Sequence, residues 1–67
     1  MFDIGKQIRK LRKTRNMKQY EIGELVGVST KTVSSWEVNR TEPSIYYLWK
    51  MADYFNVPLE YFVKEEE

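Results

Sequence analysis

Between Gln19 and Glu37, the apolar and small residues have the spacing of two short helices joined by a tight turn. The shared inner side of this pair is predicted to consist of Ile22, Val26, Val28, Val33 and Trp36. Gly23 and Gly27 are small enough for a close approach, and the hydroxyl of Ser29 can cap the second helix. Helical geometry then leaves a hydroxyl-rich face with one lysine pointing outward. The sequence therefore predicts a packed helix pair with a polar outer face.

Apolar residues at helical spacing predict three further helices around this pair. The first spans residues 4–15, where Asp3 can cap it, and its core positions are Ile4, Ile8 and Leu11. Another begins after Ser44 and has its core positions at Ile45, Leu48, Trp49, Ala52 and Phe55. A short last helix follows Pro58 and contains Leu59, Phe62 and Val63. The helices of the pair itself are expected at residues 18–26 and 30–38.

Three asparagines, Asn16, Asn39 and Asn56, stand where these helices should end. Asparagine tolerates the left-handed conformation that a chain often adopts after a helix, so we expect each to be a C-terminal cap. The chain has no alternating strand pattern, internal repeat or Pro/Gly linker. It is predicted to be one all-α domain over residues 4–63, followed by an acidic tail at 64–67.

The residue types that are missing exclude several classes of function. Among the 67 residues there is no cysteine and no histidine, which excludes disulfides and zinc fingers and removes the usual general base. There is also no glycine-rich phosphate loop, so an enzyme is not expected. We expect no metal, no cofactor and no small-molecule ligand in so small a core. Neither a leader nor a run long enough to span a bilayer is found, which predicts a cytoplasmic protein with no membrane partner.

Charge is distributed unevenly along the chain. Residues 1–40 hold nine Lys or Arg against four acidic residues, whereas residues 41–67 hold two against six. A molecule polarised in this way can present a basic face to a polyanion and keep its other face for solubility or partner contacts.

Five segments carry a resemblance to a known family: Gln19-Tyr-Glu-Ile-Gly, Leu25-Val-Gly-Val-Ser, Val33-Ser-Ser-Trp-Glu, Glu42-Pro-Ser-Ile and Val57-Pro-Leu-Glu. Together they resemble the Cro/C1 repressor type of helix-turn-helix domain, also called the Xre type, over about residues 4–63. The resemblance implies a compact five-helix, lambda-repressor-like DNA-binding domain whose helices 2 and 3 form the helix-turn-helix. It also implies a sequence-specific transcriptional regulator associated with a bacterial or phage nucleoid. Such a regulator is expected to be a repressor that binds a palindromic operator in double-stranded DNA as a homodimer.

In such domains the second helix of the motif enters the major groove, and the first crosses the phosphate backbone. Thr30, Lys31 and Ser35 match the family's main base-contacting positions, and Thr32 and Ser34 are secondary candidates for base reading. The candidates for phosphate binding are Lys18, Gln19, Asn39, Arg40 and Thr41. Because the reading face has no Arg, Asn or Gln, DNA shape or a doubled site is expected to supply much of the discrimination.

The resemblance also implies two structural features. Arg12 and Glu37 match an ion pair that ties the first helix to the end of the reading helix. The dimer contact is expected at the link between the last two helices, at Tyr54, Val57, Pro58 and Tyr61. Two positions depart from the family pattern. Gly23 stands where the family usually has alanine, which costs about 1 kcal/mol of helix propensity but still allows the helices to touch. Lys18 stands where the family usually has a Ser, Thr or Asn cap, so the start of this helix is expected to be frayed or capped by Asn16.

Two other classes of function compete with DNA binding. One is an antitoxin or adaptor whose acidic C-terminal half binds another protein. The other is RNA binding, which is less favoured because the major groove of A-form RNA is too narrow for a helix.

Overall fold

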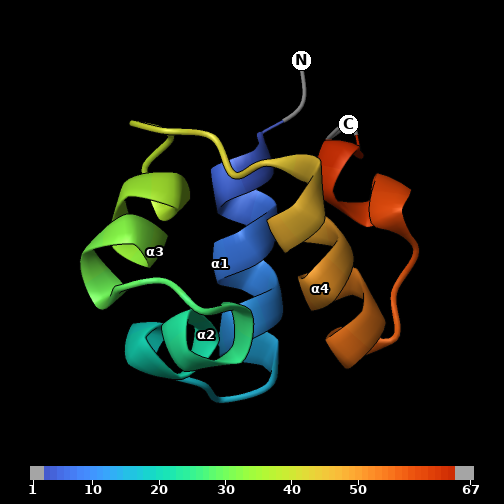
Figure 1. The fold of residues 1–67 in the computed structure, drawn as a ribbon. Helices are drawn as coiled ribbons and strands as arrows, with labels where there is room; N and C mark the ends of the chain where they lie inside the picture. Colours follow the sequence, from blue (N-terminus) through green and yellow to red (C-terminus); the bar gives the residue numbers. More distant parts are fainter. Residues whose placement is uncertain (1–2, 65–67) are drawn as a thin grey trace.

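Four α-helices and one 3-10 helix form the part of the chain that the computed structural model describes, residues 3–64. Their bounds are α1 (Ile4–Thr14), α2 (Gln19–Val26), α3 (Thr30–Glu37), α4 (Ile45–Phe55) and the 3-10 helix η1 (Leu59–Val63). α1 runs through the middle of the molecule, with α2 and α3 beside one part of it and α4 and η1 on the other side (Figure 1). The all-α class and the helix pair are confirmed. Residues 65–67 of the predicted acidic tail lie outside the described residues.

The last element corrects the prediction of five α-helices. Residues Leu59–Val63 form a 3-10 helix, in which the backbone N–H of Tyr61 donates to the carbonyl oxygen of Pro58 at 3.0 Å. Five residues make little more than one turn, and the tighter i→i+3 bonding is the form that such short pieces adopt.

The N-terminal caps follow the predictions in part. Asp3 accepts a hydrogen bond from the backbone N–H of Lys6 at 2.9 Å, and Ser29 accepts one from Thr32 at 3.2 Å. Ser44 occupies the cap position of α4, but its hydroxyl makes no capping bond. At the start of α2, the backbone N–H of Lys18 donates to the carboxylate of Glu21 at 2.7 Å. The start is thus held by Glu21, and the expected cap by Asn16 is wrong.

All three asparagines adopt the left-handed conformation, with φ of 58° at Asn16, 60° at Asn39 and 58° at Asn56. Each follows the end of a helix, because α1, α3 and α4 end at Thr14, Glu37 and Phe55. The prediction that each asparagine ends a helix in the left-handed conformation is confirmed. Asparagine adopts this conformation readily, so the chain can leave each helix without a glycine.

The core confirms most of the predicted apolar positions, but two of those in α4 are exposed. Phe55 and Phe62 are fully buried, whereas Ile45 is 64% exposed and Trp49 is 57% exposed, so these two core assignments are wrong. The buried face of α4 consists of Leu48, Met51, Ala52 and Phe55. Trp49 lies outside this buried face. On the other flank of α4, the ring of Tyr47 packs against the ring of Trp36, with 5.3 Å between the ring centroids.

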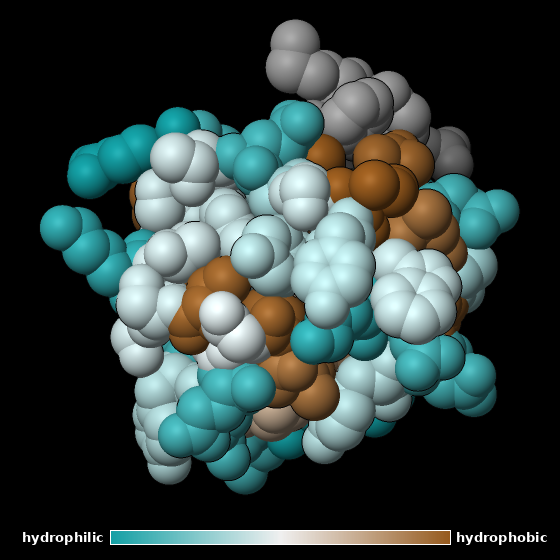
Figure 2. All heavy atoms as spheres, in the orientation of Figure 1, coloured by the Kyte–Doolittle hydropathy of each residue, from teal (hydrophilic) through white to brown (hydrophobic). Residues whose placement is uncertain are grey.

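The side of the molecule formed by η1 and the start of α4 consequently shows apolar surface to solvent (Figure 2). None of the helices in residues 3–64 combines the length and apolar character that crossing a bilayer requires.

Two glycines allow helices to approach more closely than any other residue would. A Cβ atom at Gly5 would meet the carbonyl oxygens of Trp36 and Glu37 at the end of α3, the first of them closest. A Cβ atom at Gly23 would lie 2.6 Å from the carbonyl oxygen of Val28. The expectation that Gly23 merely replaces an alanine at a small cost is therefore wrong, because the turn before α3 leaves no room for a methyl group there.

Candidate nucleic-acid interface

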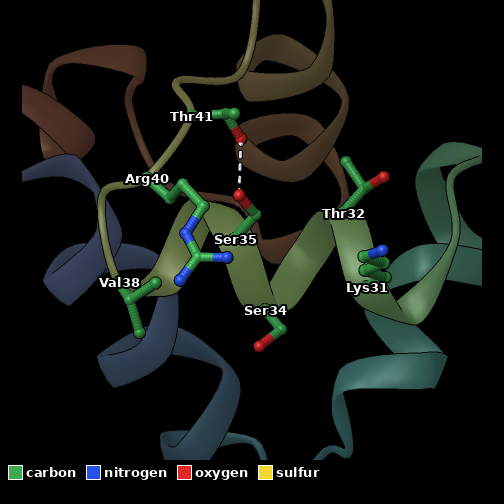
Figure 3. A pocket seen from close by; sticks show the side chains of 7 residues that line it. All are labelled: Lys31, Thr32, Ser34, Ser35, Val38, Arg40 and Thr41. Carbon is green, nitrogen blue, oxygen red and sulfur yellow. Dashed lines mark hydrogen bonds between the residues drawn. The ribbon is translucent and has the colours of Figure 1, made fainter.

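The outer face of α3 is set by the burial of its inner face. Val33 and Trp36 have 0% and 3% of their surface exposed, which fixes the rotation of the helix about its axis. Thr30 and Lys31 at its start are exposed. The outward side chains and the segment that follows α3 line a shallow hollow of about 560 Å³, formed by Lys31, Thr32, Ser34, Ser35, Val38, Arg40 and Thr41 (Figure 3).

Two of the candidate base-reading hydroxyls are held in place by other hydroxyls. Thr41 donates to Ser35 at 3.0 Å, so the hydrogen of Ser35 remains available to an acceptor outside the protein (Figure 3). The hydroxyl of Thr32 lies 3.0 Å from that of Ser29, the cap of α3. These bonds restrict the side-chain rotamers before any ligand arrives.

The predicted ion pair is present and joins α1 to the end of α3. The Nε of Arg12 donates to Oε2 of Glu37 at 2.6 Å, and Nη2 donates to Oε1 at 3.0 Å. Both side chains are largely buried, with 11% and 3% exposed. The hydrogen bonds from Arg12 to Glu37 raise the pKa of the guanidinium above its ordinary value. Nη1 of Arg12 also donates to the carbonyl oxygen of Met17 at 2.9 Å.

Two of the candidate phosphate ligands have side-chain amides engaged within the protein. Nε2 of Gln19 donates to Oε1 of Glu37 at 3.1 Å, which extends the ion pair to the start of α2. Nδ2 of Asn39 donates to Oδ1 of Asp3 at 2.7 Å, and its Oδ1 accepts from the backbone N–H of Gly5 at 3.0 Å. The hydrogen bond from Asn39, followed by that from the Lys6 backbone, lowers the pKa of Asp3.

The structure divides the remaining candidates into two places. Arg40 and Thr41 share the hollow with Lys31, so these three groups can meet one ligand together. Lys18 lies elsewhere, beside a second hollow of about 310 Å³ that also includes Lys13 of α1 and Asn16, which follows α1.

The candidate dimer residues surround the link between α4 and η1. Tyr54 is 56% exposed, Pro58 is exposed, and Val57 and Tyr61 are half-buried. The backbone carbonyl of Tyr61 accepts from Nε2 of Gln7 at 2.8 Å, which fixes η1 to α1. The burial of Gln7 and its bond to η1 could not be predicted from the sequence, since no pattern of residue types shows which amide meets which carbonyl.

Sequence and structure comparisons identify relatives of the whole domain. Residues 8–62 match the helix-turn-helix family. The chain is 33% identical over 61 residues to the repressor protein C2 of Salmonella phage P22, a match that covers 91% of this chain but only 28% of that relative.

Solved structures give the same result. The P22 c2 repressor in complex with a synthetic operator superposes with a TM-score of 0.83 at 32% identity, covering 94% of this chain and 96% of that one. SinR, a Bacillus subtilis protein and master regulator for biofilm formation, was solved in complex with DNA. It superposes with a TM-score of 0.80 at 31% identity, covering 91% and 98% of the two chains.

Proposed function

Because the chain belongs to the Cro/C1-type helix-turn-helix family, we propose that it is a transcriptional repressor that binds a specific operator in double-stranded DNA. The observation that carries the proposal is the outward face of α3, which sets Lys31 beside hydroxyl groups on an exposed helix. A helix presented in this way fits the major groove of B-DNA, which is about 12 Å wide. Bound there, the domain represses by occluding a promoter.

The start of α3 supplies the base contacts in this proposal. The ammonium of Lys31 donates to the O6 and N7 acceptors of guanine, and the methyl group of Thr30 packs on a thymine methyl. Ser35, whose hydroxyl already accepts from Thr41, donates to an acceptor on a base edge. Thr32 and Ser34 make secondary contacts. This small set of donors lacks bidentate groups, so DNA shape contributes to the choice of operator.

Phosphate groups position the domain without reading sequence. Arg40 follows α3 and binds the strand beside the hollow, while Lys18 and the start of α2 bind further along. The hydroxyl of Thr41, assigned to phosphate from the sequence, donates to Ser35 and so positions that side chain instead. For Gln19, whose amide already donates to Glu37, the contact with phosphate passes through its backbone N–H at the start of α2 or its remaining amide hydrogen. The backbone N–H of Asn39 donates to the carbonyl oxygen of Trp36, so Asn39 contacts phosphate through its remaining amide hydrogen.

A two-fold dimer accounts for recognition of a palindromic site. We assign the dimer contact to Tyr54, Val57, Pro58 and Tyr61. This assignment is supported by the exposed ring of Trp49 nearby, which lines a hollow together with Val57. Apolar surface of this kind is stabilised when a second copy covers it. Such a dimer sets its two reading helices about 34 Å apart, one turn of B-DNA.

Selection of bound duplexes from a random pool tests this function. We expect enrichment of an inverted repeat whose half-sites are centred about 10 base pairs apart. With six to ten phosphates contacted per dimer, affinity for the selected operator should fall roughly a thousandfold or more between 50 and 200 mM salt. Sedimentation at about 100 μM protein with the operator should show two chains per duplex.

A pool that yields no enriched sequence, together with a stoichiometric protein partner on purification, would instead favour the antitoxin or adaptor function. A single chain on the operator at that concentration would remove the dimer from the proposal.

A further inference from the structure

Val38 is the most exposed of the large apolar side chains in the described residues, at 65%. It follows directly on α3 and lies seven positions after Lys31, so helical spacing places both on one stripe, with Ser34 and Ser35 between them. All four line the same hollow, and Figure 3 shows Val38 beside the end of α3, on the side where Arg40 extends. An apolar group therefore stands at the end of the candidate reading face.

The length of α3 keeps Val38 within reach of the bases. Seven residues of helix advance about 10.5 Å, which corresponds to about three base pairs along a duplex. Lying along the major groove, which is wide enough to admit a helix, the eight residues of α3 span about 12 Å. When Lys31 meets a base edge, Val38 remains over the groove.

The chemistry of valine restricts what it can contact there. Its side chain has no hydrogen-bonding group for a phosphate or a base nitrogen, and Arg40 on the same hollow can supply such contacts. The apolar group that the major groove presents is the 5-methyl group of thymine. We propose that Val38 packs on a thymine methyl about three base pairs from the base read by Lys31, and so specifies thymine in each half-site. This assignment rests on the proposed function.

Replacing thymine by deoxyuridine removes that methyl group and leaves base pairing unchanged. Each thymine of the selected operator is replaced in turn, in both half-sites, and the dissociation constant is measured for the wild type and for Val38→Ala. Burying one methyl group is worth about 0.8 kcal/mol, which is roughly fourfold in affinity. At one thymine we expect about a fourfold loss per half-site in the wild type and no loss in Val38→Ala.

The matched control is Val63→Ala, because Val63 is also an exposed valine, at 41%, on η1 across the molecule from α3 (Figure 1). This variant should retain the wild-type sensitivity to deoxyuridine. Thermal melting verifies that both variants are folded.

Two results would overturn the assignment while leaving the proposed function intact. In one, Val38→Ala loses affinity at the same deoxyuridine position as the wild type. In the other, it loses affinity equally for the operator and for an unrelated duplex, which indicates a contact with the sugar-phosphate backbone. A wild-type chain that prefers no duplex would overturn the proposed function and this assignment with it.

Discussion

Arg12→Ala is expected to lower the free energy of unfolding by about 3–5 kcal/mol, because it leaves the buried carboxylate of Glu37 without its charged partner. Gln19 continues to donate to that carboxylate, and the carbonyl of Met17 loses a donor as well. A domain of this size has only about 3–10 kcal/mol of stability in total. Urea denaturation followed by circular dichroism should therefore find a much lower midpoint of unfolding for the variant than for the wild type.

The double variant Arg12→Leu/Glu37→Leu distinguishes two causes of destabilisation, the loss of a charge partner for Glu37 and the loss of side-chain packing. Replacing both charged groups by apolar ones is expected to recover most of the stability, since no buried carboxylate remains. The exposed Arg9→Ala should stay within about 0.5 kcal/mol of the wild type. If Arg12→Ala melts no lower than Arg9→Ala, the ion pair does not hold α3 in place.

Gly5→Ala should destabilise the domain by about 3 kcal/mol or more, although alanine is the better helix former. The added methyl group would meet the carbonyl oxygens of Trp36 and Glu37, and it would lie 2.8 Å from Oδ1 of Asn39. Two of these three atoms are backbone atoms, so α1 and α3 have to separate. Thermal unfolding is the measurement, and a lower melting temperature is the expected result.

Lys10→Ala is the matched control, because Lys10 lies on the exposed face of α1 and its replacement adds no atom between helices. Its melting temperature should stay close to that of the wild type. Equal or higher stability of Gly5→Ala would contradict the close approach of α1 to the end of α3.

Much of the fold was predictable from residues whose effect is local. The left-handed turns at Asn16, Asn39 and Asn56 follow from the conformational preference of asparagine. The caps at Asp3 and Ser29 follow from short side-chain oxygens placed just before a helical pattern. These features depend on neighbours within a few positions, which the sequence displays directly.

Features that depend on distant parts of the chain were less predictable. Helical spacing alone does not show how wide the buried stripe of α4 is. It predicts Ile45 and Trp49 as core residues, whereas the structure exposes both and buries Met51 instead. The importance of Gly5 depends on the end of α3, more than thirty residues away, so its isolated position in the sequence carried no signal.

The candidate site shows the same division. The outward direction of α3 followed from the pattern of Val33 and Trp36, and the structure has both buried. Gln19 and Asn39 were assigned to phosphate from their position near helix ends, but their amides also meet Glu37 and Asp3. The sequence does not single out Val38 for DNA contact, because a valine at the end of a predicted helix has no distinguishing feature until its exposure and neighbours are known.

The most direct test of DNA reading by α3 is the dissociation constant of Lys31→Ala for the selected operator and for an unrelated duplex. A base contact is worth about 1–3 kcal/mol, so we expect at least about a fivefold loss on the operator and a much smaller loss on the unrelated duplex. Arg40→Ala, which removes a phosphate contact, should weaken both complexes alike. If Lys31→Ala also weakens both alike, or neither, α3 does not read the bases.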